Sequence, residues 1–256
     1  MNKVLENLAA VLIFFHPDQE CKKNALHFKK LIKDLYIYDN SKNNRGVAAL
    51  YNKALKKAHA ENKKWLMILD QDSFLDKEEF EKYINCIEAE KEKDVIIFAP
   101  SLKRAKKNCE FALNDIVISS AMVVDVVKSM KIGGFSEELF IDEVDHEFCL
   151  KALNAGYKIK KFENILLKHK LGNKKKFLFI NFNCYRFERY YYMIRNFLWL
   201  NTKYKHKFLI MRKKYLLFFF IKSLIFCKNK LRIIKMLIKG YYDFKNNLMG
   251  KRVEIS

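Results

Sequence analysis

Apolar and polar positions alternate along the first hundred residues in a pattern that predicts strands and helices in turn. Short apolar runs, typical of buried strands, occur at Leu8–Phe15, Leu35–Tyr38, Trp65–Leu69 and Val95–Ala99. Between them, apolar residues recur at helical spacing in Cys21–Ile32, Gly46–His59 and Phe80–Ala89. This β-α-β-α-β order predicts an α/β fold with a Rossmann-like, doubly wound and mostly parallel sheet, whose crossovers are right-handed.

The middle of the chain predicts shorter elements. Strands are expected at Asp115–Val124, Tyr157–Phe162 and Ile165–Lys168, and helices at Asp125–Met130 and Glu143–Ala155. Pro100 is expected to end the strand that precedes it, and Lys103–Asn108 to form a basic loop. Gly156 suits the position after a helix, because glycine adopts the left-handed conformation that often closes one.

The charge is distributed unevenly. The chain has a net charge of +21, and residues 174–256 carry 21 Lys and Arg against 3 Asp and Glu. The residues before 174 carry 29 against 26 and are close to neutral. We therefore predict a domain at 1–173 and a basic, helical region at 174–256. Such a region favours an anionic partner, either nucleic acid or anionic lipid headgroups.

The basic region contains one apolar segment that is too short to span a membrane and one amphipathic segment that could lie on a membrane surface. Tyr215–Cys227 is apolar, but at 13 residues, with Lys222 inside, it is too short to span a bilayer. Further on, an apolar stripe lies beside basic residues at helical spacing: Cys227, Leu231, Ile234 and Ile238 beside Lys228, Arg232, Lys235 and Lys239. A basic amphipathic helix of this kind can lie on a membrane surface. The alternative is a helix that packs its stripe on the rest of the protein.

The six cysteines show no C-x-x-C pair and no metal-ligand spacing. They occur singly, mostly in apolar surroundings, which is typical of reduced core thiols and favours a cytosolic protein. The amino-terminal residues show no signal-peptide pattern.

The most informative stretch is the run Trp65–Ser73, in which five apolar residues lead into Asp-x-Asp. Alternate residues of an extended chain point to the same side, so Asp70 and Asp72 can face one point beyond the strand. Ligands bind at that edge of open α/β sheets, and two carboxylates there suit Mg²⁺ or Mn²⁺ with a diphosphate. The alternative is a polar strand end, with Ser73 or Asp76 capping a helix at Lys77–Glu90.

Further acids follow other predicted strands or loops. Asp39 ends the second strand, and Asp142, Glu143 and Asp145 precede a helix. In a doubly wound sheet these groups can converge on one crevice. The alternatives are an Asx-turn between Asp39 and Ser41, and a solvated helix start, where acids interact favourably with the helix dipole.

These residues resemble the family 2 glycosyltransferases of the GT-A fold, and most closely the bacterial rhamnosyltransferase-like members. The matching segments occur in the family's order: YDNS at 38–41, NRGVA at 44–48 with Asn52, LDQDS at 69–73, ISSA at 118–121, IGGF at 132–135, LFIDEVDHEF at 139–148, AGY at 155–157, HKLG at 169–172, RYY at 189–191 and RN at 195–196. They span most of the chain.

The resemblance implies an inverting transfer of a sugar from a nucleotide-sugar, assisted by Mg²⁺ or Mn²⁺. It assigns Asp72 as the direct metal ligand, Asp70 to the ribose or to metal-bound water, and His169 to the metal or diphosphate. It assigns Asp39, Asn44 and Asn52 to the nucleoside. By position in the 139–148 segment, Asp145 is the general base, and Asp142 and Glu147 orient the acceptor or its loop.

The same resemblance favours dTDP-rhamnose as donor, while a UDP-hexose or a galactofuranose donor stays open. It implies a glycan or lipid-linked acceptor in cell-surface polysaccharide or lipopolysaccharide synthesis, at the inner face of the cytoplasmic membrane. The competing hypothesis is a nucleic-acid-binding protein, because basic and aromatic residues interleave at Tyr185–Tyr204. The clustered acids would repel a phosphate backbone, so no nucleic-acid partner is expected. A catalytically inactive binding module is a third possibility, against which the intact acids argue.

Overall fold

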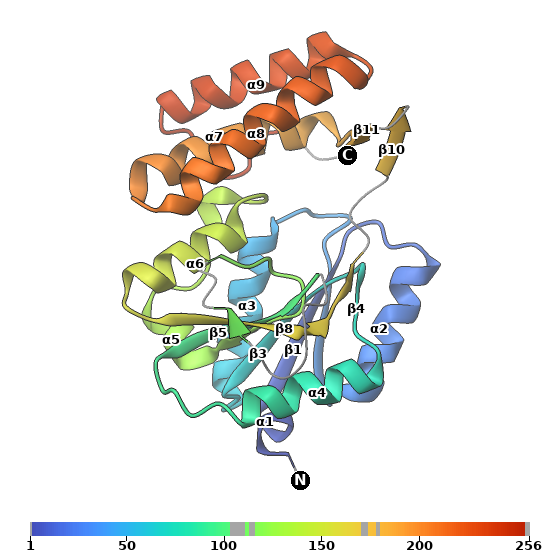
Figure 1. The fold of residues 1–256 in the computed structure, drawn as a ribbon, viewed down its shortest axis with the longest axis vertical. Helices are drawn as coiled ribbons and strands as arrows, with labels where there is room; N and C mark the ends of the chain where they lie inside the picture. The colour runs from blue at the N-terminus through green and yellow to red at the C-terminus, as the bar shows by residue number, and fades with distance from the viewer. Residues whose placement is uncertain (1, 103–110, 113–115, 170–173, 178–179, 254–256) are drawn as a thin grey trace. The chain divides into compact units, whose positions relative to one another are not determined.

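The computed structural model describes residues 2–102, 111–112, 116–169, 174–177 and 180–253 (Figure 1). Only the backbone is described at 111–112, 169, 174–177 and 180–183. The predicted basic loop at Lys103–Asn108, the side chain of His169, and residues 171 and 172 of the HKLG segment therefore lie outside the described part. The chain divides into an α/β unit, Met1–Ser136 with Asp145–Lys170, and a helical unit, Glu137–Val144 with Leu171–Ser256.

The α/β unit is built on one seven-stranded sheet in the described residues. Its strands are β1 (Leu8–Phe14), β2 (Asp34–Asp39), β3 (Trp65–Asp70), β5 (Val95–Ser101), β6 (Phe111–Ala112), β7 (Met122–Asp125) and β8 (Lys158–Leu166). They lie in the order β2-β1-β3-β7-β5-β8-β6. β7 runs antiparallel to both β3 and β5, and β6 antiparallel to β8, while the other five strands share one direction. The predicted α/β class and mostly parallel sheet are confirmed.

Helices cover both faces of this sheet (Figure 1). Alternate residues of β1 and β3, among them Ala10, Leu12 and Met67, pack with α2 (Gln19–Leu31) and α4 (Lys77–Glu88) in one core cluster. The intervening residues face the other way, where α3 (Val47–Ala60) packs on β1, β3 and α5 (Val126–Lys131). Two further helices, α1 (Lys3–Glu6) and α6 (Val144–Asn154), complete the unit.

Several predicted boundaries are wrong, each for a local reason. β5 continues through Pro100 to Ser101, where the pairing with β8 shifts register. The two strands expected at 157–168 form the single strand β8, followed by the short β9 (Lys168–His169). Of the described residues in the strand expected at 115–124, only 122–124 belong to a strand, β7, which continues to Asp125; a turn precedes it, and Ala121 has a positive φ of 57°.

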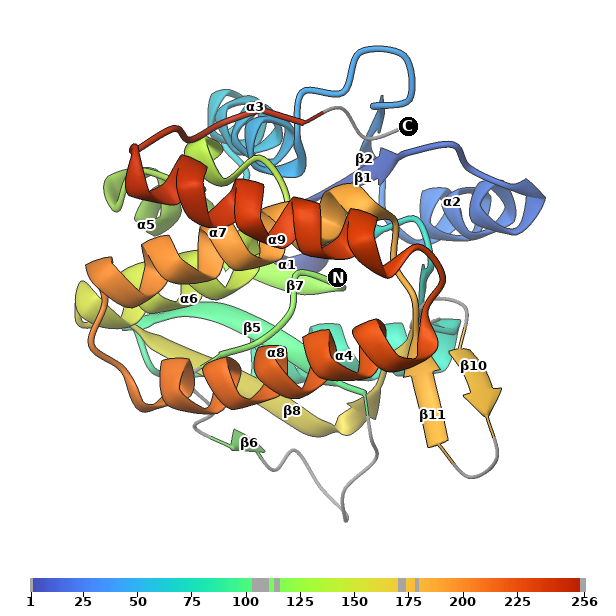
Figure 2. The ribbon, with the colours of Figure 1, turned by 90° about the horizontal axis from the view of Figure 1, so that it is seen from above.

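The helical unit holds α7 (Phe187–Lys203), α8 (Lys207–Phe226) and α9 (Lys230–Lys245), preceded by a hairpin of β10 (Lys174–Phe177) and β11 (Ile180–Asn183). α7 and α9 lie side by side in both views (Figure 2). Gly240 permits this contact, since a Cβ there would stand 2.6 Å from the Tyr191 carbonyl oxygen. Within the described residues, no helix combines the length and apolarity needed to cross a membrane.

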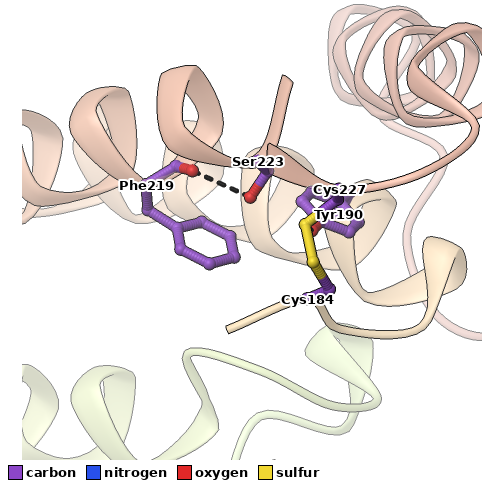
Figure 3. The surroundings of a disulfide bond; sticks show 5 residues. All are labelled: Cys184, Tyr190, Phe219, Ser223 and Cys227. Atoms are coloured by element: carbon purple, nitrogen blue, oxygen red, sulfur yellow. Dashed lines mark hydrogen bonds between the residues drawn. A yellow bond between two sulfur atoms is a disulfide. The ribbon is translucent and has the colours of Figure 1, made fainter. Parts of the chain in front are cut away.

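The prediction that all cysteines are reduced thiols is wrong at two positions. Cys184, before α7, and Cys227, after α8, form a disulfide bond beside Tyr190 (Figure 3). The two residues are 43 positions apart, so only the packing of α8 on α7 brings them together, and their spacing gives no sign of it. Cys21, Cys86 and Cys149 are free and buried, as expected, and Cys109 lies outside the described residues.

Candidate active site

The Asp-x-Asp segment lies at the carboxyl end of β3, in a turn that side-chain hydrogen bonds hold in place. The Ser73 hydroxyl accepts from the Asp70 amide at 3.1 Å and contacts the hydroxyl of Ser120, and both serines are buried. Gln71 accepts from the Phe15 amide at 2.8 Å, so its side chain joins this turn to the end of β1. The cap of α4 is Asp76, one of the two candidates from the sequence, because its side chain accepts from the Glu79 amide. Ser73 does not cap α4, and its hydroxyl instead stabilises the turn that carries Asp70 and Asp72.

Three carboxylates gather at this edge. Ser119 connects two of them, since its side chain hydrogen-bonds Asp70 and its amide donates to Asp145 at 3.3 Å. The Tyr51 hydroxyl contacts Asp70 at 3.4 Å. Burial raises the pKa of Asp70 to about 7, and the nearby charges of Asp72 and Asp145 add to the effect. A raised carboxyl pKa among like charges marks an excess of negative charge that a bound cation would relieve.

The donor set fits the expected divalent ion. Among the described residues, no three His, Cys, Asp or Glu side chains are grouped to hold a metal by themselves. Mg²⁺ and Mn²⁺ sites of nucleotide enzymes, however, use one or two carboxylates, with phosphate and water oxygens for the rest. Asp72 and Asp70 would supply that pair. The short strand β9 pairs with β4 (Ser73–Phe74), and this register sets the backbone of His169 opposite Ser73.

A pocket of about 730 Å³ lies beside Asp72. Its lining includes Asp18, Cys21 and Asn24 near the start of α2. It also includes Phe74 of β4 and Leu167 after β8. The volume is within the range of small-molecule sites, and a mainly apolar wall with a few polar groups is usual for them.

The other predicted donor-binding residues differ in what they contact. Asp39 is exposed at the end of β2, and its carboxylate accepts from the Ser41 amide at 2.8 Å. Hydrogen bonds from Ser41 lower the pKa of Asp39, so this group is ionised and can still accept from a ligand. The Asx-turn is therefore present, and the predicted nucleoside contact stays a prediction compatible with it.

The side-chain amides of Asn44 and Asn52 form hydrogen bonds with the protein backbone. Asn44 accepts from the Gly46 amide and from Asn40, which fixes the loop before α3. Asn52 makes two hydrogen bonds of 2.8 Å with the backbone of Phe135. A Cβ on Gly134, whose φ is +64°, would stand 2.5 Å from the Asn52 side-chain oxygen. These contacts assign both asparagines to loop geometry, while the nucleoside contact stays a prediction.

The acids around Asp145 are paired with cations. Asp142 forms an ion pair with Arg189, within the helical unit. Glu147 is fully buried and lies 3.3 Å from the ammonium of Lys151. Lys151 in turn donates to the Gly134 carbonyl at 2.7 Å. The acceptor-side roles of Asp142 and Glu147 stay predictions, and the observed partners give both carboxylates a structural use.

The raised pKa of Asp70 predicts a stabilising substitution. Its pKa in the fold, about 7, lies above the ordinary value of 3.8, so the ionised form is less favourable in the native state than in the unfolded chain. This cost is absent below about pH 4 and complete above about pH 7. Without divalent ions, Asp70→Asn should raise Tm at pH 8 by roughly 4 °C and lose this advantage towards pH 5.

Thermal melts in EDTA at several pH values measure this effect. Asp76→Asn is the matched control, because the pKa of Asp76 is lowered by the Glu79 amide and asparagine also caps helices. A lower Tm for Asp70→Asn than for wild type at pH 8 would contradict the electrostatic description of the site.

Comparisons with known proteins were made for the sequence and for the fold. Residues 12–119 match the model of the family described as Glycosyl transferase family 2. The dTDP-rhamnosyl transferase RfbF of Shigella flexneri is 27% identical over 232 residues, which cover 81% of this chain and 77% of that protein.

Solved structures share the fold at low sequence identity. The mannosyltransferase PcManGT from Pyrobaculum calidifontis, solved with GDP-Man and Mn²⁺, gives a TM-score of 0.56 at 11% identity, covering 93% of this chain and 74% of that chain. GalNAc-T7, solved with UDP, GalNAc and Mn²⁺, gives a TM-score of 0.53 at 10% identity, and the match covers 94% of this chain and 56% of that chain. These similarities identify the GT-A glycosyltransferase fold.

Proposed function

We propose that this chain is a family 2 glycosyltransferase of the GT-A fold that transfers a sugar with inversion from a nucleotide-diphosphate donor to a glycan or lipid-linked acceptor. The observation that carries the proposal is the convergence of Asp70, Asp72 and Asp145 at the carboxyl end of β3, with the pKa of Asp70 raised to about 7. The transfer reaction gives these three acids two tasks, which are to hold the donor and to remove a proton from the acceptor hydroxyl.

The first task is to hold the donor. Asp72, with Asp70 beside it, would bind Mg²⁺ or Mn²⁺ together with the diphosphate, and Asp39 would accept from the nucleoside. A bound divalent ion supplies Lewis-acid stabilisation of the charge that develops on the leaving diphosphate. The Gln71 side chain accepts a hydrogen bond from the Phe15 amide, which fixes the turn that carries Asp70 and Asp72 against the end of β1. His169 is the proposed further contact, on the strand next to this turn.

The second task is to remove a proton from the acceptor hydroxyl. Asp145, in the first turn of α6, receives hydrogen bonds from the Ser119 and His146 amides. These bonds orient the carboxylate. An ionised Asp145 can accept the hydroxyl proton while the acceptor oxygen attacks the anomeric carbon on the face opposite the diphosphate, which inverts the configuration.

The donor is proposed to be dTDP-rhamnose, supported by the 27% identity to a dTDP-rhamnosyl transferase. A UDP-hexose or a galactofuranose donor is the alternative. A thermal-shift screen with Mn²⁺ tests the choice directly: the proposal requires that dTDP-rhamnose raise Tm more than UDP-hexoses or UDP-galactofuranose, and only when Mn²⁺ is present. An equal shift in EDTA, or none with any nucleotide-sugar, would count against the proposed function itself.

We also propose that the enzyme acts at the inner face of the cytoplasmic membrane, in cell-surface polysaccharide or lipopolysaccharide synthesis. The support is an apolar and basic face of α8 and α9. The stripe expected on α9 is exposed except at Cys227, with Leu231 82% exposed, because Ile233 and Met236 face the helical unit's own core instead.

α8 carries the larger part of this face. Its inner side packs through Leu209, Leu216 and Ser223. Its outer side exposes seven large apolar side chains: Ile210, Met211, Tyr215, Leu217, Phe218, Ile221 and Ile225. α8 contains five basic residues and no acidic one. Two such faces would repel each other in a dimer, whereas anionic lipid attracts the lysines and takes up the apolar side chains.

Changing the outer face of α8 should release the protein from anionic membranes. Phe218→Ser with Ile221→Ser removes apolar side chains that are 64% and 44% exposed, at little cost to folding. Wild type should sediment with vesicles that contain phosphatidylglycerol and not with pure phosphatidylcholine, and the variant should sediment with neither. Leu26→Ser with Val127→Ser, which removes two exposed apolar residues from the α/β unit, is the matched control.

Sedimentation of the variant equal to that of wild type would refute this surface. Binding of wild type to oligonucleotides, in preference to anionic vesicles at the same salt concentration, would instead favour the nucleic-acid alternative.

A further inference from the structure

The segment immediately before Asp145 has an unusual backbone. Phe140, Asp142 and Glu143 all have positive φ, at 66°, 54° and 63°. Residues with a Cβ seldom adopt this conformation, and they keep it only where the surroundings enforce it. The cause of this conformation therefore lies in the contacts that residues 137–143 make.

Two adjacent residues of α7 supply those contacts. Arg195 donates to the carbonyls of Glu138 at 3.3 Å and Leu139 at 3.2 Å. Asn196 donates through its amide nitrogen to the carbonyls of Leu139 at 2.9 Å, Ile141 at 2.6 Å and Asp142 at 2.9 Å. Four of the five carbonyls from 138 to 142 are thus bound by neighbouring side chains of one helix.

This clamp is itself fixed. Arg195 and Asn196 are fully buried and hydrogen-bond each other, with the Arg195 Nε donating to the Asn196 Oδ1 at 3.0 Å. The other arm of Arg195 donates to the Gly250 carbonyl at 2.7 Å. A buried arginine with all these partners has one geometry, which a lysine lacking the planar fork cannot reproduce.

The side chains of the segment are held as well. The Asp142 carboxylate pairs with Arg189 and the fully buried Glu143 carboxylate with Arg212 of α8. α6 begins at Val144, and Asp145 follows one residue later. Residues 137–143 lead directly into α6 along the chain, so a change in their backbone would reach the start of α6, where Asp145 lies.

We propose that Arg195 and Asn196 are positioning residues for the transfer reaction, which act on Asp145 through the backbone of residues 138–142. The inference rests on the proposed function, in which Asp145 is the base. In this proposal α7 contributes to turnover independently of any membrane contact. Arg195 and Asn196 affect the proposed base, whereas Asp39 and Asp72 are the groups proposed to bind the donor.

The test is a cycle of four proteins: wild type, Asp145→Asn, Arg195→Lys and the double variant. Arg195→Lys should lower kcat by up to about 10²-fold, as small misplacements of reacting groups do, and leave the KM for the donor unchanged. In the Asp145→Asn background the same change should have no further effect on the residual rate, because its only route to the reaction is gone.

Three readouts keep the inference distinct from a general loss of structure. Binding of a nucleoside diphosphate with Mn²⁺ should be equal in all four proteins. Hydrogen exchange should rise at residues 137–144 and not in β3. Arg232→Lys is the matched control, since this α9 arginine is 56% exposed and pairs with Glu188. If Arg195→Lys does not fold, Asn196→Ser, which keeps a smaller donor, enters the same cycle.

The possible failures are distinguishable. Normal turnover by Asp145→Asn would remove the base from the proposed function. A collapse in Asp145→Asn with unchanged kcat in Arg195→Lys would overturn the positioning role, and so would a further loss of rate in the double variant.

Discussion

Asp145→Asn is expected to lower kcat for sugar transfer by about 10²–10⁴-fold, the usual cost of losing a positioned base. Asparagine keeps the shape of the side chain and can still accept from the Ser119 amide, so α6 and its first turn should persist. Donor and metal binding should change little, because those contacts are proposed for Asp39 and Asp72. Nucleoside diphosphate release, with water or an added glycan as acceptor, measures the loss.

Glu147→Gln is the control within the same helix. Glu147 is buried against Lys151, so this variant should lose stability more than rate. If Glu147→Gln stops turnover while Asp145→Asn retains most of it, the two acids have been assigned the wrong roles.

Asp72→Ala is expected to abolish transfer and to weaken nucleoside diphosphate binding in the presence of Mn²⁺. Asp72 is half-buried beside the pocket near α2, and its removal takes away the direct carboxylate ligand proposed for the ion. The fold should survive, because the hydrogen bonds of Gln71 and Ser73 that hold this turn remain in the variant.

Titration calorimetry of dTDP with Mn²⁺ and circular dichroism of the same samples separate binding from folding. Asp18→Ala is a suitable comparison, since it lines the same pocket and caps α2 without belonging to the Asp-x-Asp pair. Equal affinities for wild type and Asp72→Ala would remove Asp72 from the metal site.

The acidic turn and the sheet beneath it could be predicted from local patterns. The apolar run of β3 ending on Asp70, and the strand–helix alternation before it, need only the periodicity of neighbouring residues. The direction of β7 could not be predicted in this way, because an antiparallel strand between β3 and β5 is decided by pairing partners that are distant in sequence.

The residues that the sequence reasoning missed are those whose roles depend on tertiary contacts. Tyr51 contacts Asp70 from α3, and nothing in its own neighbourhood marks it. Ser119 lies in the ISSA segment of the family resemblance, but that pattern does not indicate its hydrogen bonds to Asp70 and Asp145. Arg195 and Asn196 were noted only as part of a family pattern, since their work is done on carbonyls more than fifty positions away. The Cys184–Cys227 bond was missed for the same reason.

Gly156 and Asn52 show the difference between a local pattern and a tertiary contact. Gly156 was assigned from its place after a helical segment, and its φ of +82° confirms it. The nucleoside contact that the resemblance assigns to Asn52 stays a prediction, and its hydrogen bonds with the Phe135 backbone are contacts that only the folded chain reveals.

The most direct test is one NMR time course of the protein with dTDP-rhamnose, Mn²⁺ and an acceptor, either water or an added glycan, to which EDTA is added midway. We expect dTDP and a rhamnosyl product to appear together, the first-formed anomer of the product to have the configuration opposite to the donor's, and both signals to stop growing on chelation. Continued turnover in EDTA, or a product that retains the donor's configuration, would contradict the proposed function.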